Sequence, residues 1–416
     1  MKIRLGIWEW AFYGALVLLY GLTRNPFPEF GDSLGFVYFA SQGFDLATNA
    51  TSHFLYSNLN HLLLSLLPFL SPVLVLSLVS LVFGLLSVEQ VRQLGLALNL
   101  KRTGALFAAA IFALGFSWWR QVVTIEVYTM QLFWVLRMLV LMSRDEQTSK
   151  YQRAWWVSLL YGLSLLAHIQ NLLLLPLFVY YYWRGRKNGV ALWSPLLALL
   201  LFAILFIPPS LRGTNSYAAI FFDRQFQGEV LQFEFMTIMK GFVRSLGYLA
   251  YNFHLFLLAI GLGLWLWLRE RSIWVMALVA SSLLFWGFAM RYNVNDNYVF
   301  FLLPYAVLAI AGGLGWQKFA QARKWEPWGF TLASLSILVY FLAVQLAGQF
   351  PEANRWAEPK AYKGGLSYYL FPGRASAPDP VSLAQQIQQG IIPPNPDFDR
   401  YDMALKVGEV LASRNQ

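Results

Sequence analysis

The sequence predicts an all-helical protein that crosses a membrane many times. Of its 416 residues 58% are hydrophobic and 12% are charged, whereas about a quarter of the residues of soluble domains are charged. Apolar runs such as 62–86 and 273–290 recur along most of the length, and about 20 apolar residues suffice to cross roughly 30 Å of hydrocarbon. The same composition excludes an ordinary cytosolic enzyme and a disordered chain.

Basic clusters between the apolar runs indicate the cytoplasmic ends of the spans. An even number of crossings must lie between consecutive clusters, which gives about eleven spans, with the amino terminus in the cytoplasm and the carboxyl terminus outside. The clusters are Lys2/Arg4, Lys101/Arg102, Arg144/Lys150/Arg153, Arg184/Arg186/Lys187, Arg269/Arg271 and Lys318/Arg323/Lys324. The expected single spans are 5–23, 73–94, 105–118, 128–142, 190–207, 246–268, 273–290, 298–315 and 330–347. Because the basic residues serve topology, the formal charge of +10 does not indicate nucleic-acid binding.

Segment 155–183 is too short for two full spans, yet both of its flanks are basic. We therefore expect two short helices that meet around residues 168–171.

Three exterior segments are too long to be mere connectors. Segment 24–70 should form two surface helices, at 34–44 and 53–66, and segment 208–244 resembles a helix lying on the membrane interface. The tail 349–416, with amphipathic helices at 381–389 and 403–412, should form a small exterior cap beside a transmembrane domain of residues 1–348.

The chemistry cannot be that of common soluble enzymes. The absence of cysteine excludes disulfides, thiolate metal sites and cysteine nucleophiles. No nucleophile elbow, zinc-protease motif, Walker A motif or nucleotide-binding glycine fingerprint occurs. The first apolar run contains Glu9 and lacks an A-x-A cleavage pattern, so it should be retained as an anchor. Because no nucleotide-binding motif occurs, the energy for any group transfer must arrive with the substrate, as it does in a lipid-phosphate-linked donor.

Asp32 follows a proline-rich turn and a glycine at the exterior mouth of the first span. A carboxylate there can accept a proton from an incoming hydroxyl, as a general base does. The alternative is that Asp32 caps a helix that begins near Ser33.

The outer turn 118–129 contains Arg120, Glu126 and Tyr128. Arg120 and Glu126 either form a structural ion pair, as charges near a membrane usually do, or bind substrate. In the second interpretation Arg120 holds a phosphate, which suits its guanidinium group, and Glu126 orients Arg120 or binds a sugar hydroxyl. Arg244 either holds a phosphate or anchors its helix to the interface.

Two further outer turns are unusually polar. His168, Gln170 and Asn171 lie at the tip of the short hairpin, where they either join helices or line a site. The turn 291–297 is either a solvated loop or one wall of a sugar site, and it contains Arg291, Tyr292 and Asp296. His53 and His61 are eight residues apart, a poor metal signature. We expect no metal and no other cofactor.

The order of these motifs resembles the GT-C superfamily of polytopic glycosyltransferases, and more narrowly the bacterial relatives of the endoplasmic-reticulum protein O-mannosyltransferases. The motifs are Gly31-Asp32-Ser33, Trp119…Glu126-Val127-Tyr128-Thr129, Gly162-Leu163-Ser164…His168…Leu175-Pro176 and Tyr292…Asp296…Phe301-Leu302-Leu303-Pro304. Two departures are Gly35, where the family usually has an acid, and Asn49–Tyr56, which lacks the family's His-Pro-Pro-Gly-Tyr-like run. The resemblance implies a polyprenyl-phosphate sugar donor, an inverting transfer and a general-base role for Asp32.

We therefore predict a glycosyltransferase at the outer face of a bacterial inner membrane, acting on a hydroxyl of a protein, glycan or lipid acceptor. Arg120, Arg244 and Arg291 are expected to bind the donor phosphate. The expected substrate contacts are Glu126, Tyr128, His168, Asn171, Tyr292, Asp296 and His53. Two other classes fit the composition: a transporter or flippase for lipid-linked or small substrates, with Glu9, Glu89 and Arg137 along its path, and a non-catalytic subunit of an envelope-polysaccharide system.

Overall fold

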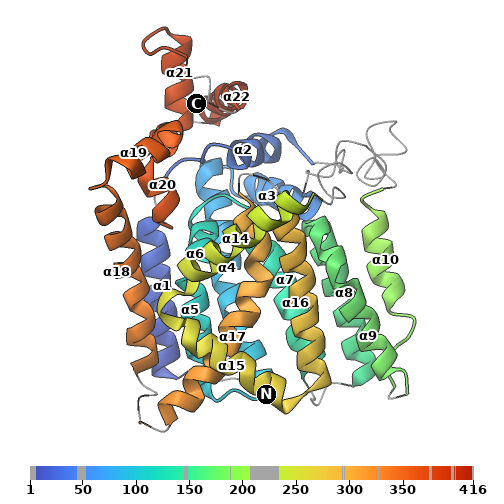
Figure 1. Ribbon diagram of the computed structural model, residues 1–416. Coiled ribbons are helices and arrows are strands. Elements are labelled where there is room, and N and C mark those ends of the chain that lie inside the picture. Colours follow the sequence, from blue (N-terminus) through green and yellow to red (C-terminus); the bar gives the residue numbers. More distant parts are fainter. Residues whose placement is uncertain are drawn as a thin grey trace.

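The protein is a bundle of long helices with shorter helices packed on one end (Figure 1). The computed structural model describes residues 6–414 except 45–52, 145–148, 188, 207–233, 293, 295, 322, 324, 326–327, 374–376, 395–397 and 399. Within the described residues every regular element is a helix, which confirms the predicted fold class. The expected interface helix in 208–244 falls largely outside these residues.

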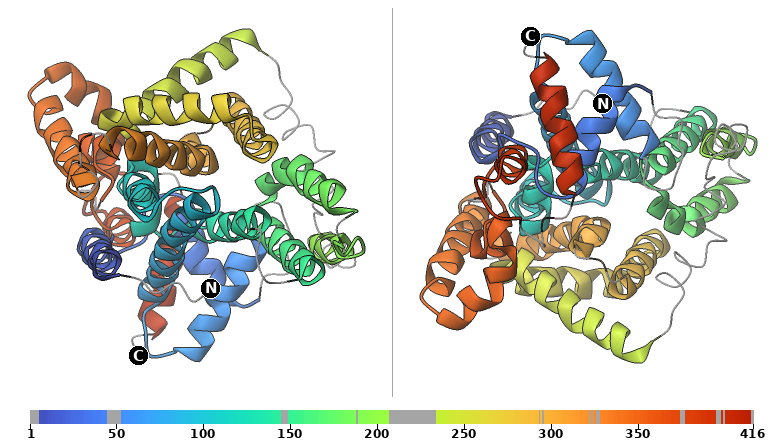
Figure 2. Two further views of the ribbon diagram at one scale, coloured as in Figure 1. Left: turned by 90° about the horizontal axis from the view of Figure 1, so that it is seen from below. Right: turned by 90° about the horizontal axis from the view of Figure 1, so that it is seen from above.

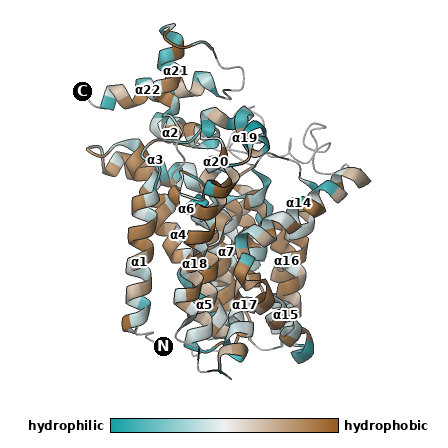
Figure 3. Ribbon diagram, turned by 60° about the vertical axis from the view of Figure 1, so that its left-hand side comes forward, coloured by the Kyte–Doolittle hydropathy of each residue, from teal (hydrophilic) through white to brown (hydrophobic). Residues whose placement is uncertain are grey.

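The helices of the bundle mostly run roughly along one axis, and a few cross it obliquely (Figures 1 and 3). In chain order they are α1 (Ile7–Thr23), α4 (Pro72–Ala97), α5 (Arg102–Ala113), α6 (Phe116–Val123), α7 (Tyr128–Ser143), α8 (Lys150–Ala167), α9 (Leu175–Gly185), α10 (Pro195–Ala203), α14 (Phe235–Phe253), α15 (Leu257–Glu270), α16 (Ile273–Arg291), α17 (Leu302–Gln321) and α18 (Gly329–Ala347). Short 3₁₀ helices connect some of them: η1 (Ile169–Leu174), η2 (His254–Phe256) and η3 (Asn297–Phe301).

The remaining helices gather at the end of the bundle where the carboxyl terminus lies, opposite the amino terminus (Figure 1). We call this end the cap face and the opposite end the N-terminal face. The helices of the cap face are α2 (Asp32–Gln42), α3 (Phe54–Leu66), α19 (Pro351–Ala357), η5 (Glu358–Lys363), α20 (Leu366–Leu370), α21 (Pro380–Gln388) and α22 (Tyr401–Arg414). These bounds confirm the two surface helices expected in 24–70 and the two expected in the tail.

Length and composition qualify five helical segments of the described chain as membrane spans, or six if the bent pair α5–α6 counts as one span. Helices α1 and α7 are shorter apolar helices in the same bundle. The apolar segment around α17 is 94% buried and that of α18 only 17%, so α17 forms the centre of the bundle and α18 its lipid-facing edge. The protein is thus an all-helical membrane protein.

Close packing around α17 depends on glycines. A Cβ atom on Gly263 of α15 would lie 1.7 Å from the carbonyl oxygen of Ala311, and one on Gly315 of α17 would lie 1.9 Å from that of Ala259. Only glycine permits this separation of the two backbones, the usual device by which membrane helices approach closely.

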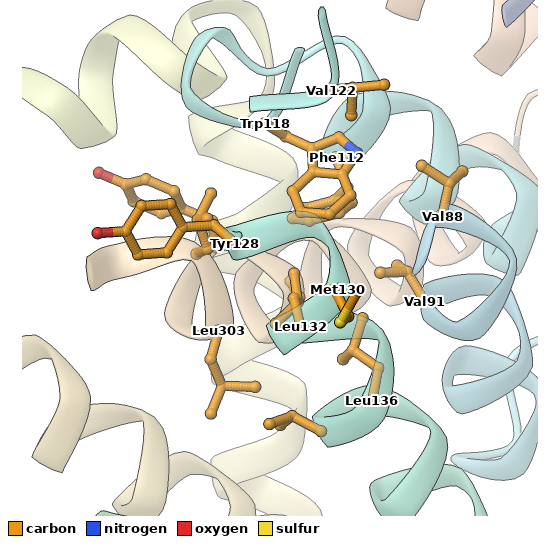
Figure 4. Packing of buried hydrophobic residues seen from close by; sticks show 14 of the residues in the cluster. Val88, Val91, Phe112, Trp118, Val122, Tyr128, Met130, Leu132, Leu136 and Leu303 are labelled. Carbon is orange, nitrogen blue, oxygen red and sulfur yellow. The ribbon is translucent and has the colours of Figure 1, made fainter. Parts of the chain in front are cut away.

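One expected span is broken. The sequence predicts a helix at 105–118, but α5 ends at Ala113 and α6 starts at Phe116 with a bend of 68°. The backbone N–H of Ser117 at the new helix start donates to the side chain of Asn252 at 2.8 Å, which satisfies a group that the break leaves without an intrahelical partner. Phe112 and Trp118, on either side of the break, pack with ring centroids 4.7 Å apart (Figure 4).

The short hairpin of 155–183 has the expected form. His168 has an extended backbone that ends α8, and η1 and α9 follow it. The span expected at 246–268 instead begins earlier, since α14 starts at Phe235 and bends through η2 into α15.

Candidate functional site

The predicted site residues of the first three motifs meet at the cap face. The hydroxyl of Ser33 in α2 donates to the carbonyl of Ile125 at 2.9 Å, which fixes the start of α2 against the turn between α6 and α7. The backbone N–H of Glu126 in that turn donates to the hydroxyl of Ser80 in α4 at 3.2 Å. These bonds place Asp32 and Glu126 on the same part of the surface.

Asp32 is the first residue of α2, directly after Gly31, whose φ of 110° suits glycine. No side-chain hydrogen bond caps this helix, so the interpretation of Asp32 as a capping residue is wrong. The Asp32 side chain is 49% exposed and its Oδ1 atom forms an ion pair with Nη2 of Arg400. A half-exposed carboxylate is accessible to an incoming hydroxyl, whose proton a general base must reach.

Glu126 and Asp296 are the other acids of the site, and both are largely buried. Burial, and then the nearby carboxylates of Asp32 and Asp296, raise the pKa of the Glu126 carboxyl well above its ordinary value. Burial, and then Asp32, also raise the pKa of Asp296, against the opposing effect of Lys363. Within the described residues neither acid belongs to a salt bridge. Burial therefore disfavours the ionised form of both carboxyls, and a protonated carboxyl can donate a hydrogen bond.

His53 and His168 form a second polar feature beside these acids. Their ring centroids lie 5.0 Å apart. Burial is the main cause that lowers the pKa of both rings, so each is neutral near pH 7. Nδ1 of His53 contacts the Ala167 carbonyl at 3.2 Å, and Nδ1 of His168 accepts from the Gln170 N–H at 3.1 Å. One ring therefore presents an acceptor and the other a donor, a suitable pair for sugar hydroxyls.

Aromatic rings continue the wall from His168. The rings of Tyr128 and Phe300 lie 5.5 Å and 6.0 Å from His168, and Tyr292 lies 5.1 Å from Phe300. Tyr128 and Tyr292 thus lie in the same cluster as the predicted polar residues.

Asn171 lies beneath this cluster, in the bundle. It is fully buried, donates to the Ser164 carbonyl at 2.8 Å and accepts from the Gln131 side chain at 3.1 Å. Both ends of its amide are thus engaged by the protein, so its observed role is to join α7, α8 and η1.

Arg120 is engaged by partners that the sequence did not indicate. The expected ion pair with Glu126 is not formed; Nη2 of Arg120 instead lies 3.2 Å from Glu29. Nη1 donates to the Tyr368 carbonyl at 2.5 Å, and the guanidinium lies 4.3 Å from the centre of the Tyr368 ring. Arg120 is nearly fully buried and joins the first loop to the tail.

Arg244 and Arg291 lie on neighbouring helices near one close contact. A Cβ atom on Gly241 of α14 would lie 1.8 Å from the Met290 carbonyl of α16. The indole N–H of Trp286 donates to the Ser245 hydroxyl at 3.2 Å, so the two helices stay together over this stretch. Arg244 is next to Ser245 and Arg291 is next to Met290, which places both cations at this edge of the cap face.

The tail contributes residues that the sequence analysis missed. Tyr368 contacts Arg120 and Arg400 pairs with Asp32, and the charge of Lys363 opposes the rise in the pKa of Asp296. The tail is held there by the Tyr251 hydroxyl, which donates to the Leu370 carbonyl at 2.6 Å. Glu29, in the proline-rich turn before Asp32, was also missed, although an acid only three residues from Asp32 in the sequence could have been considered a site residue. Nothing in the local sequence distinguishes Arg400 from other surface arginines.

The described part of the chain contains no group of three or more His, Cys, Asp or Glu residues with the geometry to hold a metal ion.

Comparisons with known proteins agree with this architecture. Residues 46–190 match the family described as the Protein O-mannosyl-transferase TMEM260 N-terminal domain. This match includes His53, Arg120, Glu126, Tyr128 and His168, and Asp32 lies outside it. No curated protein matches the chain.

Solved structures share the fold over nearly the whole chain. The crystal structure of ArnT from Cupriavidus metallidurans bound to undecaprenyl phosphate superposes with a TM-score of 0.54 at 15% identity, covering 98% of this chain and 76% of ArnT. Its apo state gives 0.54 at 14% identity with the same coverage. An Archaeoglobus fulgidus oligosaccharyltransferase tethered with an acceptor peptide gives 0.50 at 12% identity, covering 95% of this chain and 58% of the other. The chain thus shares its fold with ArnT and with the oligosaccharyltransferase, and residues 46–190 match the O-mannosyl-transferase domain family.

Proposed function

We propose that the chain moves a sugar from a polyprenyl-phosphate donor to an acceptor hydroxyl, with inversion, at the cap face of the bundle. This face would be the outer face of a bacterial inner membrane, with the amino terminus in the cytoplasm. The observation that carries the proposal is the contrast among the acids of the site: Asp32 is half-exposed at the mouth, while burial raises the pKa of Glu126 and Asp296.

In this proposal Asp32 accepts the proton of the acceptor hydroxyl. The acceptor oxygen forms a bond to the anomeric carbon from the side opposite the phosphate, and the bond between that carbon and the phosphate oxygen breaks. The polyprenyl phosphate leaves with the electron pair, so charge develops on its oxygen. Oriented cations stabilise such a charge, and the Arg244–Arg291 edge is the place we assign to it.

Arg120 has a different part in the proposal. Its guanidinium is already held by Glu29 and by Tyr368, so we assign it to shaping the site. Lipid phosphate is a reasonable donor class because ArnT, which shares the fold, was crystallised with undecaprenyl phosphate.

Glu126, Asp296 and the His53–His168 pair would hold the sugar. Burial disfavours the charged form of all four groups. Carboxyls and imidazoles together offer both donors and acceptors, which suits a neutral polyol. Tyr128 and Tyr292 would supply the apolar wall against the sugar ring.

The test is transfer by the purified protein in lipid vesicles. A panel of short-chain polyprenyl-phosphate sugars is supplied with peptide, glycan and lipid acceptors, and free polyprenyl phosphate and the glycosylated product are measured. We expect one donor to be consumed and the product to have the inverted anomeric configuration by NMR. Retained configuration, or movement of intact donor across the vesicle with no product, would contradict the proposal.

A further inference from the structure

The ion pair between Asp32 and Arg400 joins the mouth of the site to a residue 368 positions later in the chain. The contact uses one guanidinium nitrogen, Nη2, and one carboxylate oxygen, Oδ1. The other oxygen of Asp32 has no hydrogen-bond partner among the residues that the structure describes. The pair therefore engages one carboxylate oxygen and leaves the other available.

Aromatic packing brings the two backbones together beside this pair. The ring of Phe398, two residues before Arg400, lies 4.9 Å from that of Phe30, two residues before Asp32, in an edge-to-face arrangement. Further along the two helices, Nζ of Lys406 in α22 lies 5.8 Å from the ring centre of Tyr38 in α2. Helices α2 and α22 thus lie side by side on the cap face (Figure 2).

Two local features hold the Arg400 guanidinium beside Asp32. A Cβ atom on Gly35 of α2 would lie 3.3 Å from Nη1 of Arg400, so a larger residue at position 35 would crowd the guanidinium. Arg400 itself has φ of 64°, a left-handed conformation that costs free energy in any residue other than glycine. The fold maintains this conformation at the point where α22 begins.

Stability does not account for this arrangement. The side chains of Arg400 and Asp32 are 44% and 49% exposed, and ion pairs at such exposure contribute little to folding. Residues in costly backbone conformations gather at functional sites. We propose that Arg400 is a positioning residue for Asp32: it holds Oδ1 so that the other oxygen faces the acceptor hydroxyl. This inference rests on the proposed base role of Asp32, and it makes the tail 349–416 part of the site.

The test compares Arg400→Gln, Arg400→Lys and Lys406→Gln in the vesicle transfer assay. A misplaced reacting group costs up to about 100-fold in rate, so we expect Arg400→Gln to lower kcat about 10- to 100-fold with little change in the KM of the donor. Arg400→Lys keeps a cation near Oδ1 and should restore part of the lost kcat. Lys406→Gln removes a cation from the same helix that does not touch Asp32 and should keep the wild-type kcat.

The outcomes separate this inference from the proposed function. An unchanged or increased kcat in Arg400→Gln would overturn the positioning role, and so would an equal loss in Lys406→Gln, which would indicate that docking of α22 alone matters. If Arg400→Gln fails to fold, Arg400→Lys decides: a kcat at or above the wild-type value overturns the role, and a lower kcat at an unchanged melting temperature supports it. The double variant Asp32→Asn/Arg400→Gln should be no slower than Asp32→Asn. Full activity of Asp32→Asn would refute the base assignment itself, whereas an inactive Asp32→Asn with a normal Arg400→Gln would refute only the positioning.

Discussion

Acidic side chains lie near both ends of the bundle, but only the cap face contains largely buried acids that no cation pairs with among the described residues. Toward the N-terminal face, the carboxylate of Glu89 accepts from Nε and Nη2 of Arg92, both at 2.8 Å, and from the Tyr13 hydroxyl at 2.5 Å. Glu9 accepts from Nη2 of Arg102 at 2.6 Å and from the Gly6 N–H at 2.9 Å. These carboxylates have their partners within the protein.

At the cap face Glu29 and Asp32 are each paired with an arginine, but two further acids lack a salt bridge among the described residues. These are Glu126 and Asp296, and burial raises the pKa of both. Buried polar groups cost free energy unless they are hydrogen-bonded, so a protein retains incomplete ones where a ligand completes them. We therefore assign a stabilising role to the ion pairs near the N-terminal face, and a role in substrate binding or catalysis to the acids of the cap face.

The largest effect is expected from Asp32→Asn. Loss of a general base lowers the rate of transfer about 10²- to 10⁴-fold, while the melting temperature should stay close to that of the wild type because the side chain is half-exposed. Transfer rate and thermal unfolding in detergent measure the two properties. Asp402→Asn, which removes an exposed carboxylate from α22, is the matched control and should leave both unchanged. If Asp32→Asn strongly lowered the melting temperature but left the activity per folded molecule normal, Asp32 would have a structural role and not a catalytic one.

The opposite result is expected from Arg92→Ala. Arg92 is fully buried, and removal of one member of a buried ion pair costs about 3–5 kcal/mol because it leaves the other charge uncompensated. We expect a lower melting temperature and normal kcat for the molecules that fold. The side chain of Arg102 is 57% exposed and that of its partner Glu9 only 7%. Arg102→Ala should therefore cost more than the loss of a fully exposed pair, which is up to about 1 kcal/mol, but less than Arg92→Ala.

An intermediate effect is expected from Arg244→Gln and Arg291→Gln. A hydrogen bond to a charged group contributes about 2 kcal/mol, which corresponds to roughly a 30-fold weaker affinity for the donor. Binding of a short-chain polyprenyl phosphate measures this directly. Lys240→Gln, an exposed cation on the same helix α14, should bind normally. If all three variants bound the polyprenyl phosphate equally well, the phosphate site would not lie at the Arg244–Arg291 edge.

The smallest effect is expected from Glu126→Gln, and it depends on pH. The folded-state pKa of Glu126 is raised, so its stabilising contribution is fully present below the unfolded pKa and is lost as the pH rises through the folded pKa. Glutamine stays neutral, so the variant should gain stability relative to the wild type as the pH rises above the ordinary carboxyl range. Melting temperatures of both proteins across this range give the difference. A gain on acidification instead would mean that the folded protein holds Glu126 ionised.

Much of the helical framework could be predicted from the sequence. Helices α1, α4, α7, α16 and α18 correspond to the expected spans, since an apolar run and its basic flank are local features. The break in the 155–183 hairpin was predicted for the same reason: a polar tip lies between two basic flanks. The bend between α5 and α6 was not predicted, because it is stabilised by Asn252, 135 residues away from Ser117.

The candidate site could be predicted only in part. Asp32, Glu126, His53, His168 and Asp296 were singled out from the sequence, because polar groups between apolar helices are conspicuous, and the fold brings them to one face. Their partners were not predictable. Glu29 and Tyr368 reach Arg120 across 91 and 248 residues, and Arg400 reaches Asp32 across 368.

By itself the sequence determined that this chain is helical, lies in a membrane and concentrates polar side chains in turns between its apolar helices. These properties follow from local composition, which sets the free energy of transfer from water to lipid segment by segment. Tertiary structure alone decided which cation neutralises which acid. It also decided that Glu29 and Tyr368 bind Arg120 and that the tail reaches Asp32. Such choices depend on contacts between distant segments, whose geometry exists only after the helices have packed.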